Sequence, residues 1–121
     1  MTKRILVVED QEDSRRIMRD LLNTTDYEVT EAENGEEALA AVAKQRPDLI
    51  LMDIQLPIMD GYEATRRIKA DPSLSSIPII AVTSYALDGY EEKARSAGCD
   101  DFVPKPYSPR QLLAKIRQFL P

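Results

Sequence analysis

The sequence contains no histidine and a single cysteine, Cys99. A serine or cysteine nucleophile activated by histidine therefore cannot be assembled, and histidine-ligated zinc or iron is also excluded. Any resident cation must be a hard one held by oxygen, which points to Mg²⁺ or a close relative. One cysteine cannot form an internal disulfide and fits a reducing compartment, so we expect a cytoplasmic protein.

Positive charge and long apolar runs are also scarce. The net charge of −5 argues against non-specific binding to nucleic acid or to an anionic membrane, which both need clustered Lys and Arg. No apolar stretch approaches the length of a membrane span, and the run at 5–8 is stopped at once by two acids, so it is too short for a signal peptide. A chain of 121 residues suits one domain, which we expect over 1–121.

Apolar runs and helical patterns alternate along the chain. Strands are predicted at 3–8, 27–33, 49–52 (closed by Asp53), 77–82 and 101–104. The first predicted helix carries apolar residues at helical spacing, namely Ile17, Met18, Leu21 and Leu22. The other four helices are predicted to begin at Asn34 with Glu37, Asp60 with Glu63, Asp88 with Glu91, and Ser108 with Pro109. This alternation predicts a flavodoxin-like, doubly wound α/β fold: five helices around a five-stranded parallel sheet of order 2-1-3-4-5.

In that strand order, acidic residues converge at one edge of the sheet. The first strand ends in Glu9 and Asp10, and its neighbour, the third strand, ends in Asp53. The fourth strand delivers Thr83 to the same edge, and the fifth delivers Lys105. Open α/β sheets bind their ligands at the carboxyl ends of the strands, so this convergence predicts a site.

Three neighbouring carboxylates repel one another, so a proton or a cation must settle the site. Mg²⁺ suits it because it accepts a few carboxylates, keeps some waters and completes its shell with a phosphate oxygen. Asp10 and Asp53 are the expected direct ligands; Glu9 is expected to act through water, and a backbone carbonyl near Gln55 to add an oxygen. Asp53 can then attack phosphorus to give an aspartyl phosphate. The Lys105 ammonium would neutralise charge on the phosphoryl group.

Thr83 would offer its hydroxyl to a phosphoryl oxygen. The motifs at the strand ends resemble those of the receiver domain of two-component response regulators, and the resemblance extends over the whole chain. The matching pieces are Val-Val-Glu-Asp at 7–10, Leu-Met-Asp-Ile-Gln-Leu-Pro at 51–57, Met-Asp-Gly at 59–61, Ala-Val-Thr-Ser at 81–84 and Lys-Pro at 105–106. The chain is most similar to stand-alone receivers of the DivK type, through 48–57 and the Gly-Cys pair at 98–99.

The resemblance implies that Asp53 receives a phosphoryl group from a phosphohistidine on a sensor histidine kinase or a histidine phosphotransferase. The absence of histidine agrees, because the donor must then come in trans. It also implies that phosphorylation shifts a pre-existing equilibrium as Thr83 moves toward the phosphate and Phe102 turns inward. A simple core position for Phe102 is the alternative. The Lys105–Pro106 bond is expected to be cis, as is usual in this family.

The 83–121 face is the expected moving surface and the expected contact for a downstream protein. Tyr85, Tyr90 and Tyr107 lie on or near it, as partner contacts or as half-buried packing residues. The predicted function is that of a phosphoacceptor signalling protein without a DNA-binding output domain, and not an enzyme beyond Mg²⁺-dependent self-phosphorylation and self-dephosphorylation.

Three alternatives remain beside this prediction. A Mg²⁺-dependent phosphatase with an aspartyl-phosphate intermediate usually needs a second acid near its nucleophile, but the residue two after Asp53 is Gln55. The chain could also be a receiver excised from a longer protein. A degenerate receiver that only docks is the third alternative, and the complete set of acids, threonine and lysine argues against it.

Overall fold

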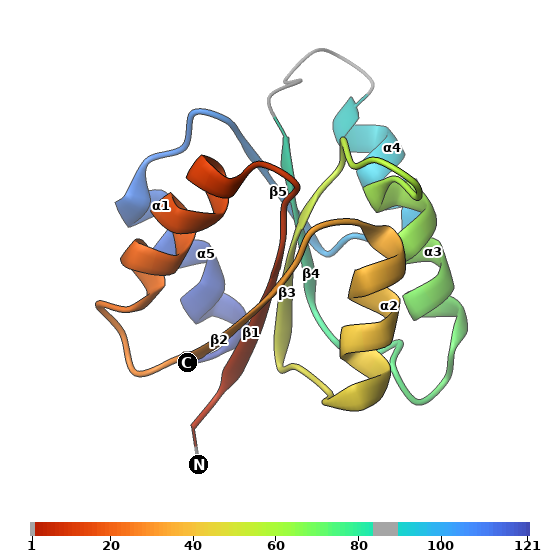
Figure 1. Cartoon of the computed structure of the whole chain (residues 1–121), viewed down its shortest axis with the longest axis horizontal. Helices are drawn as coiled ribbons and strands as arrows, with labels where there is room; N and C mark the ends of the chain where they lie inside the picture. The colour runs from red at the N-terminus through yellow and green to blue at the C-terminus, as the bar shows by residue number, and fades with distance from the viewer. Residues whose placement is uncertain (1, 84–89) are drawn as a thin grey trace.

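A computed structural model describes residues 2–83 and 90–121. Within them, five parallel strands form one sheet of order β2-β1-β3-β4-β5, as predicted (Figure 1). The strands are β1 (Arg4–Val8), β2 (Glu28–Ala32), β3 (Leu49–Asp53), β4 (Ile79–Thr83) and β5 (Asp101–Pro104). The helices are α1 (Glu12–Leu22), α2 (Gly35–Lys44), α3 (Gly61–Ala70), α4 (Tyr90–Ala97) and α5 (Pro109–Phe119).

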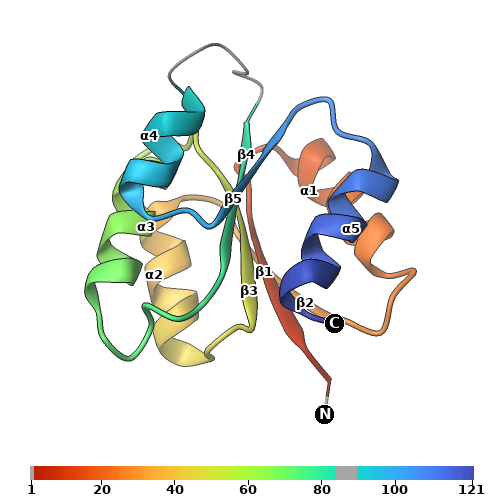
Figure 2. The same ribbon diagram turned by 180° about the vertical axis from the view of Figure 1, so that it is seen from behind.

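The sheet separates two helical layers. Helices α1 and α5 cover one face, and α2, α3 and α4 cover the other (Figures 1 and 2). Successive residues of a strand point to opposite faces, so each central strand feeds both cores. In β1, Ile5 and Val7 join the core under α1 and α5, whereas Leu6 and Val8 join the core under α2 to α4. This double burial explains why β1, β3 and β4 read as continuous apolar runs.

The helix starts follow the predicted capping residues wherever the structure describes them. The amides of Glu37, Glu63 and Gln111 donate to the side chains of Asn34, Asp60 and Ser108, respectively. In each case, a side-chain oxygen accepts from one of the backbone N–H groups that a helix leaves unpaired at its start. The predicted start at Asp88 lies outside the described residues, as do Ser84 and Tyr85.

Apart from one-residue shifts at the ends of β1 and β2, two expectations differ from the structure. Strand β4 begins at Ile79 rather than at 77, because the Ile77 amide donates to Leu74 in the preceding turn and Pro78 has no N–H for a ladder. Ile17 was expected on the buried face of α1 but is 61% exposed, whereas the adjacent Met18 is 4% exposed. The buried stripe of α1 is thus narrower than its apolar residues suggest, and Ile17 lies on its border.

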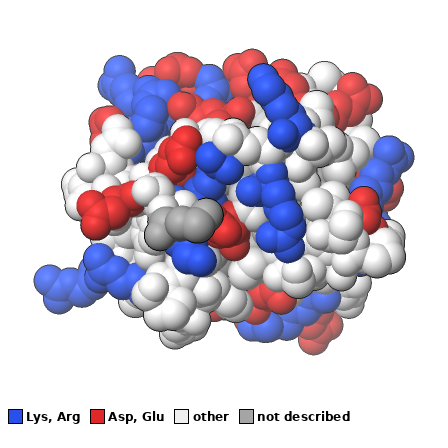
Figure 3. All heavy atoms as spheres, turned by 90° about the horizontal axis from the view of Figure 1, so that it is seen from below, with Lys and Arg blue, Asp and Glu red and all other residues white. Residues whose placement is uncertain are grey.

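In the part of the chain that the structure describes, no helix is long and apolar enough to cross a membrane. Figure 3 views the end of the molecule at which both termini lie in Figure 1. Acidic and basic side chains are interspersed across that face. This face therefore offers no continuous basic surface of the kind that binds nucleic acid non-specifically.

Candidate functional site

Three carboxylates meet where β1 and β3 end. In the parallel ladder between these strands, Val8 lies opposite Met52, so the next residues, Glu9 and Asp53, lie side by side at the ends of their strands. One carboxylate oxygen from each of Glu9, Asp10 and Asp53 lies within 4.8 Å of the others. Glu9 is 2% exposed and Asp53 is 7% exposed. The predicted convergence of these three acids is confirmed.

The Lys105 ammonium enters the same cluster from the end of β5. Its Nζ donates to Glu9 Oε1 and, at 3.3 Å, to Asp53 Oδ2. The Lys105 amide donates to the Thr83 carbonyl at 2.7 Å, which sets the lysine one step beyond the β4–β5 ladder. The Lys105–Pro106 bond is cis, as expected. The Lys105 side chain therefore points into the acid cluster and not into solvent.

The surroundings of Lys105 change its acidity. Burial lowers the pKa of the ammonium, but the hydrogen bond to Glu9 and the negative charges of Asp53 and Glu9 outweigh it and raise the pKa above its ordinary value. The amine therefore stays protonated at neutral pH and offers a fixed positive charge next to the carboxylates.

The loop after β3 holds the Asp53 carboxylate in place. The Gln55 amide donates to Asp53 Oδ1 at 3.0 Å, and the Gly61 amide donates to the Ile54 carbonyl at 2.9 Å. A Cβ at position 61 would lie 2.3 Å from the Asp53 carbonyl oxygen, so only glycine lets α3 start this close to the end of β3. Asp53 Oδ2 faces Lys105 while Oδ1 faces the loop, which fixes both carboxylate oxygens.

Thr83 lies on β4, the neighbour of β3, and Phe102 lies on β5, the next strand of the sheet. Thr83 ends β4 and is fully buried, one residue past Val82, the partner of Asp53 in the ladder. Phe102 is partly buried and packs against the core under α2 to α4. The positions thus suit the predicted switch pair, and their movement stays a prediction.

The only cysteine is not part of this site. Cys99 is buried, and its Sγ lies 3.8 Å from Thr65 Oγ1. Burial raises the pKa of the thiol to about 11, against a smaller lowering by the Thr65 hydrogen bond. The thiol is therefore protonated at neutral pH, and it is inert as a nucleophile, as the missing histidine suggests.

A mainly apolar groove of about 400 Å³ adjoins the acid cluster. It lies between α1 and the segment after β5, and its lining includes Ile17, Met18, Pro106 and Tyr107 together with Lys105. The exposed Ile17 therefore borders a concave surface that opens next to the acids. Helical spacing groups Ile17 with the other apolar residues of α1, so the sequence does not reveal this surface.

Arg15 is a second residue that the sequence does not reveal. It is only 8% exposed and its guanidinium donates to the Glu9 carbonyl at 2.9 Å. A helical wheel places it near the buried stripe of α1, but arginine is rarely assigned to a buried position.

The donor set fits a hard divalent cation. Three carboxylates converge from two strand ends, and the described residues of the cluster provide oxygen donors and no sulfur or imidazole. Lys105 contacts two of the carboxylates, so negative charge remains in excess around Asp10. This excess is what a cation would neutralise.

Comparison with known proteins identifies the family. The family model described as the response regulator receiver domain matches residues 5–117. This chain belongs to that family. As a receiver domain it is part of two-component signalling, and the family and the fold expected from its motifs are confirmed.

Receiver domains of known structure and a curated relative resemble the whole chain. It is 43% identical over 120 residues to the polar-differentiation response regulator DivK of Brucella anthropi, covering 99% of this chain and 98% of that protein. A putative response regulator from Chloroflexus aurantiacus superposes with a TM-score of 0.95 at 29% identity, covering 99% and 98% of the two chains. The receiver domain of a sensor histidine kinase from Pseudomonas aeruginosa PAO1 has a TM-score of 0.91 at 36% identity, covering 98% of each chain. That structure contains a magnesium ion coordinated in its active-site cleft.

Proposed function

We propose that Asp53 is the phosphoacceptor of this receiver domain and that residues 1–121 act as one signalling unit in the cytoplasm. The observation that carries the proposal is the buried Asp53 carboxylate, held between two further acids and the Lys105 ammonium. A buried carboxylate with fixed oxygens and a neighbouring cation is arranged as a nucleophile. The lone, buried thiol supports the cytoplasmic location.

Mg²⁺ is the proposed cofactor. Asp10 and Asp53 would bind it directly, Glu9 would bind through water, and the backbone carbonyl of Gln55 would supply a further oxygen. When bound, the ion neutralises charge on the transferring phosphoryl group. The Pseudomonas aeruginosa receiver, with magnesium in its cleft, supports this assignment by its similarity.

The residues of the chain then divide the work of phosphoryl transfer. An Asp53 carboxylate oxygen forms a bond to phosphorus as the bond from phosphorus to the donor imidazole nitrogen breaks. Lys105 already lies 3.3 Å from Asp53 Oδ2 and would turn from the free carboxylate to a phosphoryl oxygen. The Thr83 hydroxyl, at the end of β4, would also donate a hydrogen bond to a phosphoryl oxygen. Phosphoryl transfer depends mostly on such positioning and charge neutralisation.

A phosphohistidine donor must lie on a second protein, because this chain has no histidine. We propose a sensor histidine kinase or a histidine phosphotransferase. The groove beside Lys105, with Ile17 exposed at its border, would bind an apolar helical surface of that partner while its phosphohistidine reaches Asp53. No nucleic acid or membrane is proposed as a partner.

Phosphorylation would shift the 83–121 face through Thr83 and Phe102 and so change the binding of a downstream protein. Phe102 is partly buried, so it can turn further inward if Thr83 moves toward the phosphate. Such a switch biases two existing conformations of one fold. Tyr107 lies on this face beside the groove, and the side chains of Tyr85 and Tyr90 lie outside the described residues.

Incubation with Mg²⁺ and acetyl phosphate, followed by intact mass measurement, tests the proposal. We expect one added phosphoryl group on the native protein and none on Asp53→Asn. Asp13→Asn is the matched control, because Asp13 is an exposed acid in the first turn of α1 outside the acid cluster, and it should still gain the group. An adduct that persists in Asp53→Asn would exclude Asp53 as the acceptor. Rapid release of phosphate over many turnovers would indicate the phosphatase instead.

A further inference from the structure

Arg15 is a buried cation at the edge of the acid site. Its Nη1 donates to the backbone carbonyl of Glu9 at 2.9 Å and, more weakly, to that of Asp10 at 3.4 Å. Both carbonyls belong to residues whose side chains form the acid cluster. Arg15 therefore contacts the backbone of two site residues, whereas Lys105 contacts the Glu9 carboxylate.

The guanidinium is itself held by acids from two elements. Its Nε lies 3.3 Å from Glu31 in β2, Nη1 lies 3.3 Å from Glu33 just beyond that strand, and Nη2 pairs with Glu12 in the first turn of α1. The side chain of Arg15 is 9% exposed. With partners on all of its nitrogens, the planar group has little freedom to turn, so its direction toward the two carbonyls is fixed.

Among the described residues, few other hydrogen bonds hold the two peptides whose carbonyls Arg15 contacts, Glu9–Asp10 and Asp10–Gln11. Strand β1 ends at Val8, and the Glu9 amide makes the last ladder-like bond, to the Ala32 carbonyl at 3.0 Å. After it, the chain turns toward α1, and the Gln11 amide donates to Glu9 Oε2 at 3.2 Å. The direction of the Asp10 side chain depends on the orientation of the peptides on either side of it, and the Arg15 guanidinium stabilises that orientation through their carbonyls.

We propose that Arg15 is a positioning residue, which holds the Glu9–Asp10 backbone so that both carboxylates present their oxygens to a divalent cation. This rests on the proposed function only in that the cluster binds Mg²⁺; it adds that the affinity depends on a residue with no ligand atom in the site. Groups that orient metal ligands typically change metal affinity by 10- to 100-fold when they are removed.

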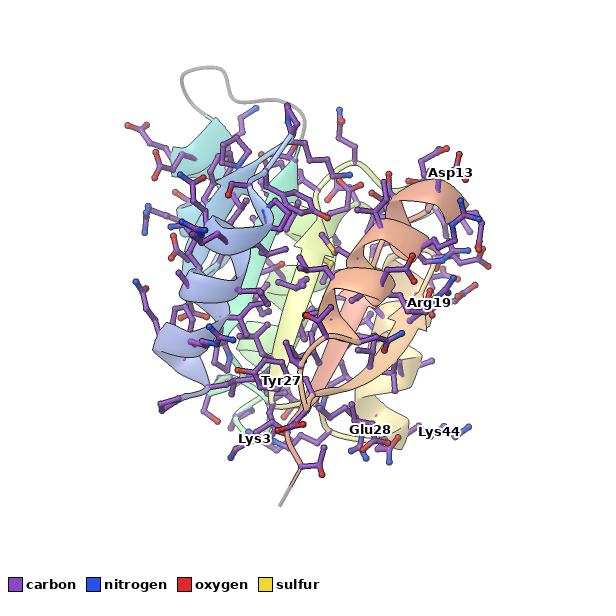
Figure 4. The ribbon with its side chains drawn as sticks, turned by 90° about the vertical axis from the view of Figure 1, so that its left-hand side faces the viewer. Lys3, Asp13, Arg19, Tyr27, Glu28 and Lys44 are labelled. Atoms are coloured by element: carbon purple, nitrogen blue, oxygen red, sulfur yellow. The ribbon has the colours of Figure 1, made fainter. Side chains whose placement is uncertain are left out.

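Arg19 offers a matched control on the same helix. It pairs with Glu31 at 2.9 Å and lies 3.9 Å from Glu12, so it shares two acidic partners with Arg15, but its side chain is 34% exposed. Figure 4 shows Asp13 at the end of α1 that is nearest to the site and Arg19 farther along the helix. Arg19→Met removes the same charge as Arg15→Met without removing a contact to the Glu9 or Asp10 carbonyl.

The test is a Mg²⁺ titration of the purified, unphosphorylated proteins by calorimetry. Unfolding measurements in the same buffer and at the same temperature establish first that each variant is folded. We expect Arg15→Met to raise the dissociation constant roughly tenfold. Arg15→Lys keeps one donor and the charge, and should restore most of the affinity. Arg19→Met should change it by less than about twofold, because exposed ion pairs constrain their surroundings little.

A second measurement needs no metal. In the Mg²⁺-free proteins, hydrogen exchange of the Gln11 amide, which shares a peptide with the Asp10 carbonyl, should accelerate in Arg15→Met and stay unchanged in Arg19→Met, because the released peptide loses its fixed orientation. If Arg15→Met is less stable but binds Mg²⁺ as tightly as the native protein, Arg15 is structural only and the proposal is wrong. If the native protein binds Mg²⁺ but gains no phosphoryl group, the proposed function fails while this inference stands.

Discussion

Lys69 and Lys105 are two partly buried lysines at opposite ends of the sheet, with side chains 17% and 21% exposed. Among the described residues, the Lys69 ammonium donates to one carboxylate, Asp100, and to the carbonyls of Ser75 and Ile77. Asp100 in turn accepts from the Ile79 amide at 2.8 Å, so this pair is balanced in charge and hydrogen bonds. It connects α3 to the amino ends of β4 and β5.

The centre around Lys105 is not balanced. Its single ammonium contacts two of three clustered carboxylates, so the folded protein concentrates negative charge at the carboxyl ends of β1 and β3. Folding alone does not require such an excess, because it destabilises the site unless a cation binds. The difference teaches that a lysine matched by its acids serves the fold, and that one outnumbered by them marks the place where a ligand is expected.

The largest expected effect separates the two lysines by activity. Lys105→Met should slow phosphorylation of Asp53 by acetyl phosphate by about tenfold or more, because it removes a positive charge aimed at the phosphoryl group. Lys69→Met should leave the rate within about twofold, since Lys69 acts at the other end of the sheet. Rates come from intact mass against time at saturating Mg²⁺. Equal rates for both variants would remove the functional distinction between the two centres.

The second effect separates the two acids by stability, with opposite signs. Without Mg²⁺, Asp53→Asn should raise the free energy of unfolding by about 1 kcal/mol, because it relieves repulsion among the three carboxylates. Asp100→Asn should lower it by about 1–2 kcal/mol, since it breaks a matched pair and weakens the bond from the Ile79 amide. Urea denaturation of both variants checks this. If Asp53→Asn is destabilised like Asp100→Asn, the acid cluster is not strained by its charge.

The third effect uses Mg²⁺ itself. A ligand that binds only the folded state at about ten times its dissociation constant stabilises by about 1.4 kcal/mol. We expect a gain of this size for the native protein and for Asp100→Asn relative to each metal-free form, and a much smaller one for Asp53→Asn, which lacks a proposed ligand. Thermal unfolding with Mg²⁺ and with excess chelator measures it, and NaCl of equal ionic strength controls for screening. A gain that is the same in all three proteins would indicate non-specific screening.

The sequence predicts the acid cluster well because its members lie at strand ends. Once the alternation of strands and helices fixes the strand order, Glu9 and Asp53 must become neighbours, whatever their side chains contact. The Lys69–Asp100 pair was not predicted, since these residues lie in a helix and a loop whose approach depends on tertiary packing. The same holds for Arg15 and Ile17 on α1: helical periodicity defines which residues share a face, but not how wide the covered stripe is or which long side chain crosses it.

The smallest effect concerns the pH dependence of the Lys105 contacts. The folded protein raises the pKa of Lys105 above the ordinary value of 10.5, so the folded state retains the proton to higher pH than the unfolded chain does. The stabilisation that the protonated Lys105 gives to the folded state is fully present below pH 10.5 and is lost as the pH rises through the folded-state pKa.

The difference in unfolding free energy between the native protein and Lys105→Met should therefore be constant from about pH 7 to about pH 9.5 and then shift against the native protein. Tyr107, whose pKa burial raises, and Cys99 also ionise in this range, but both variants contain them, so the difference largely cancels their contribution. A difference that stays constant to about pH 11.5 would show that the acids around Lys105 do not hold its proton.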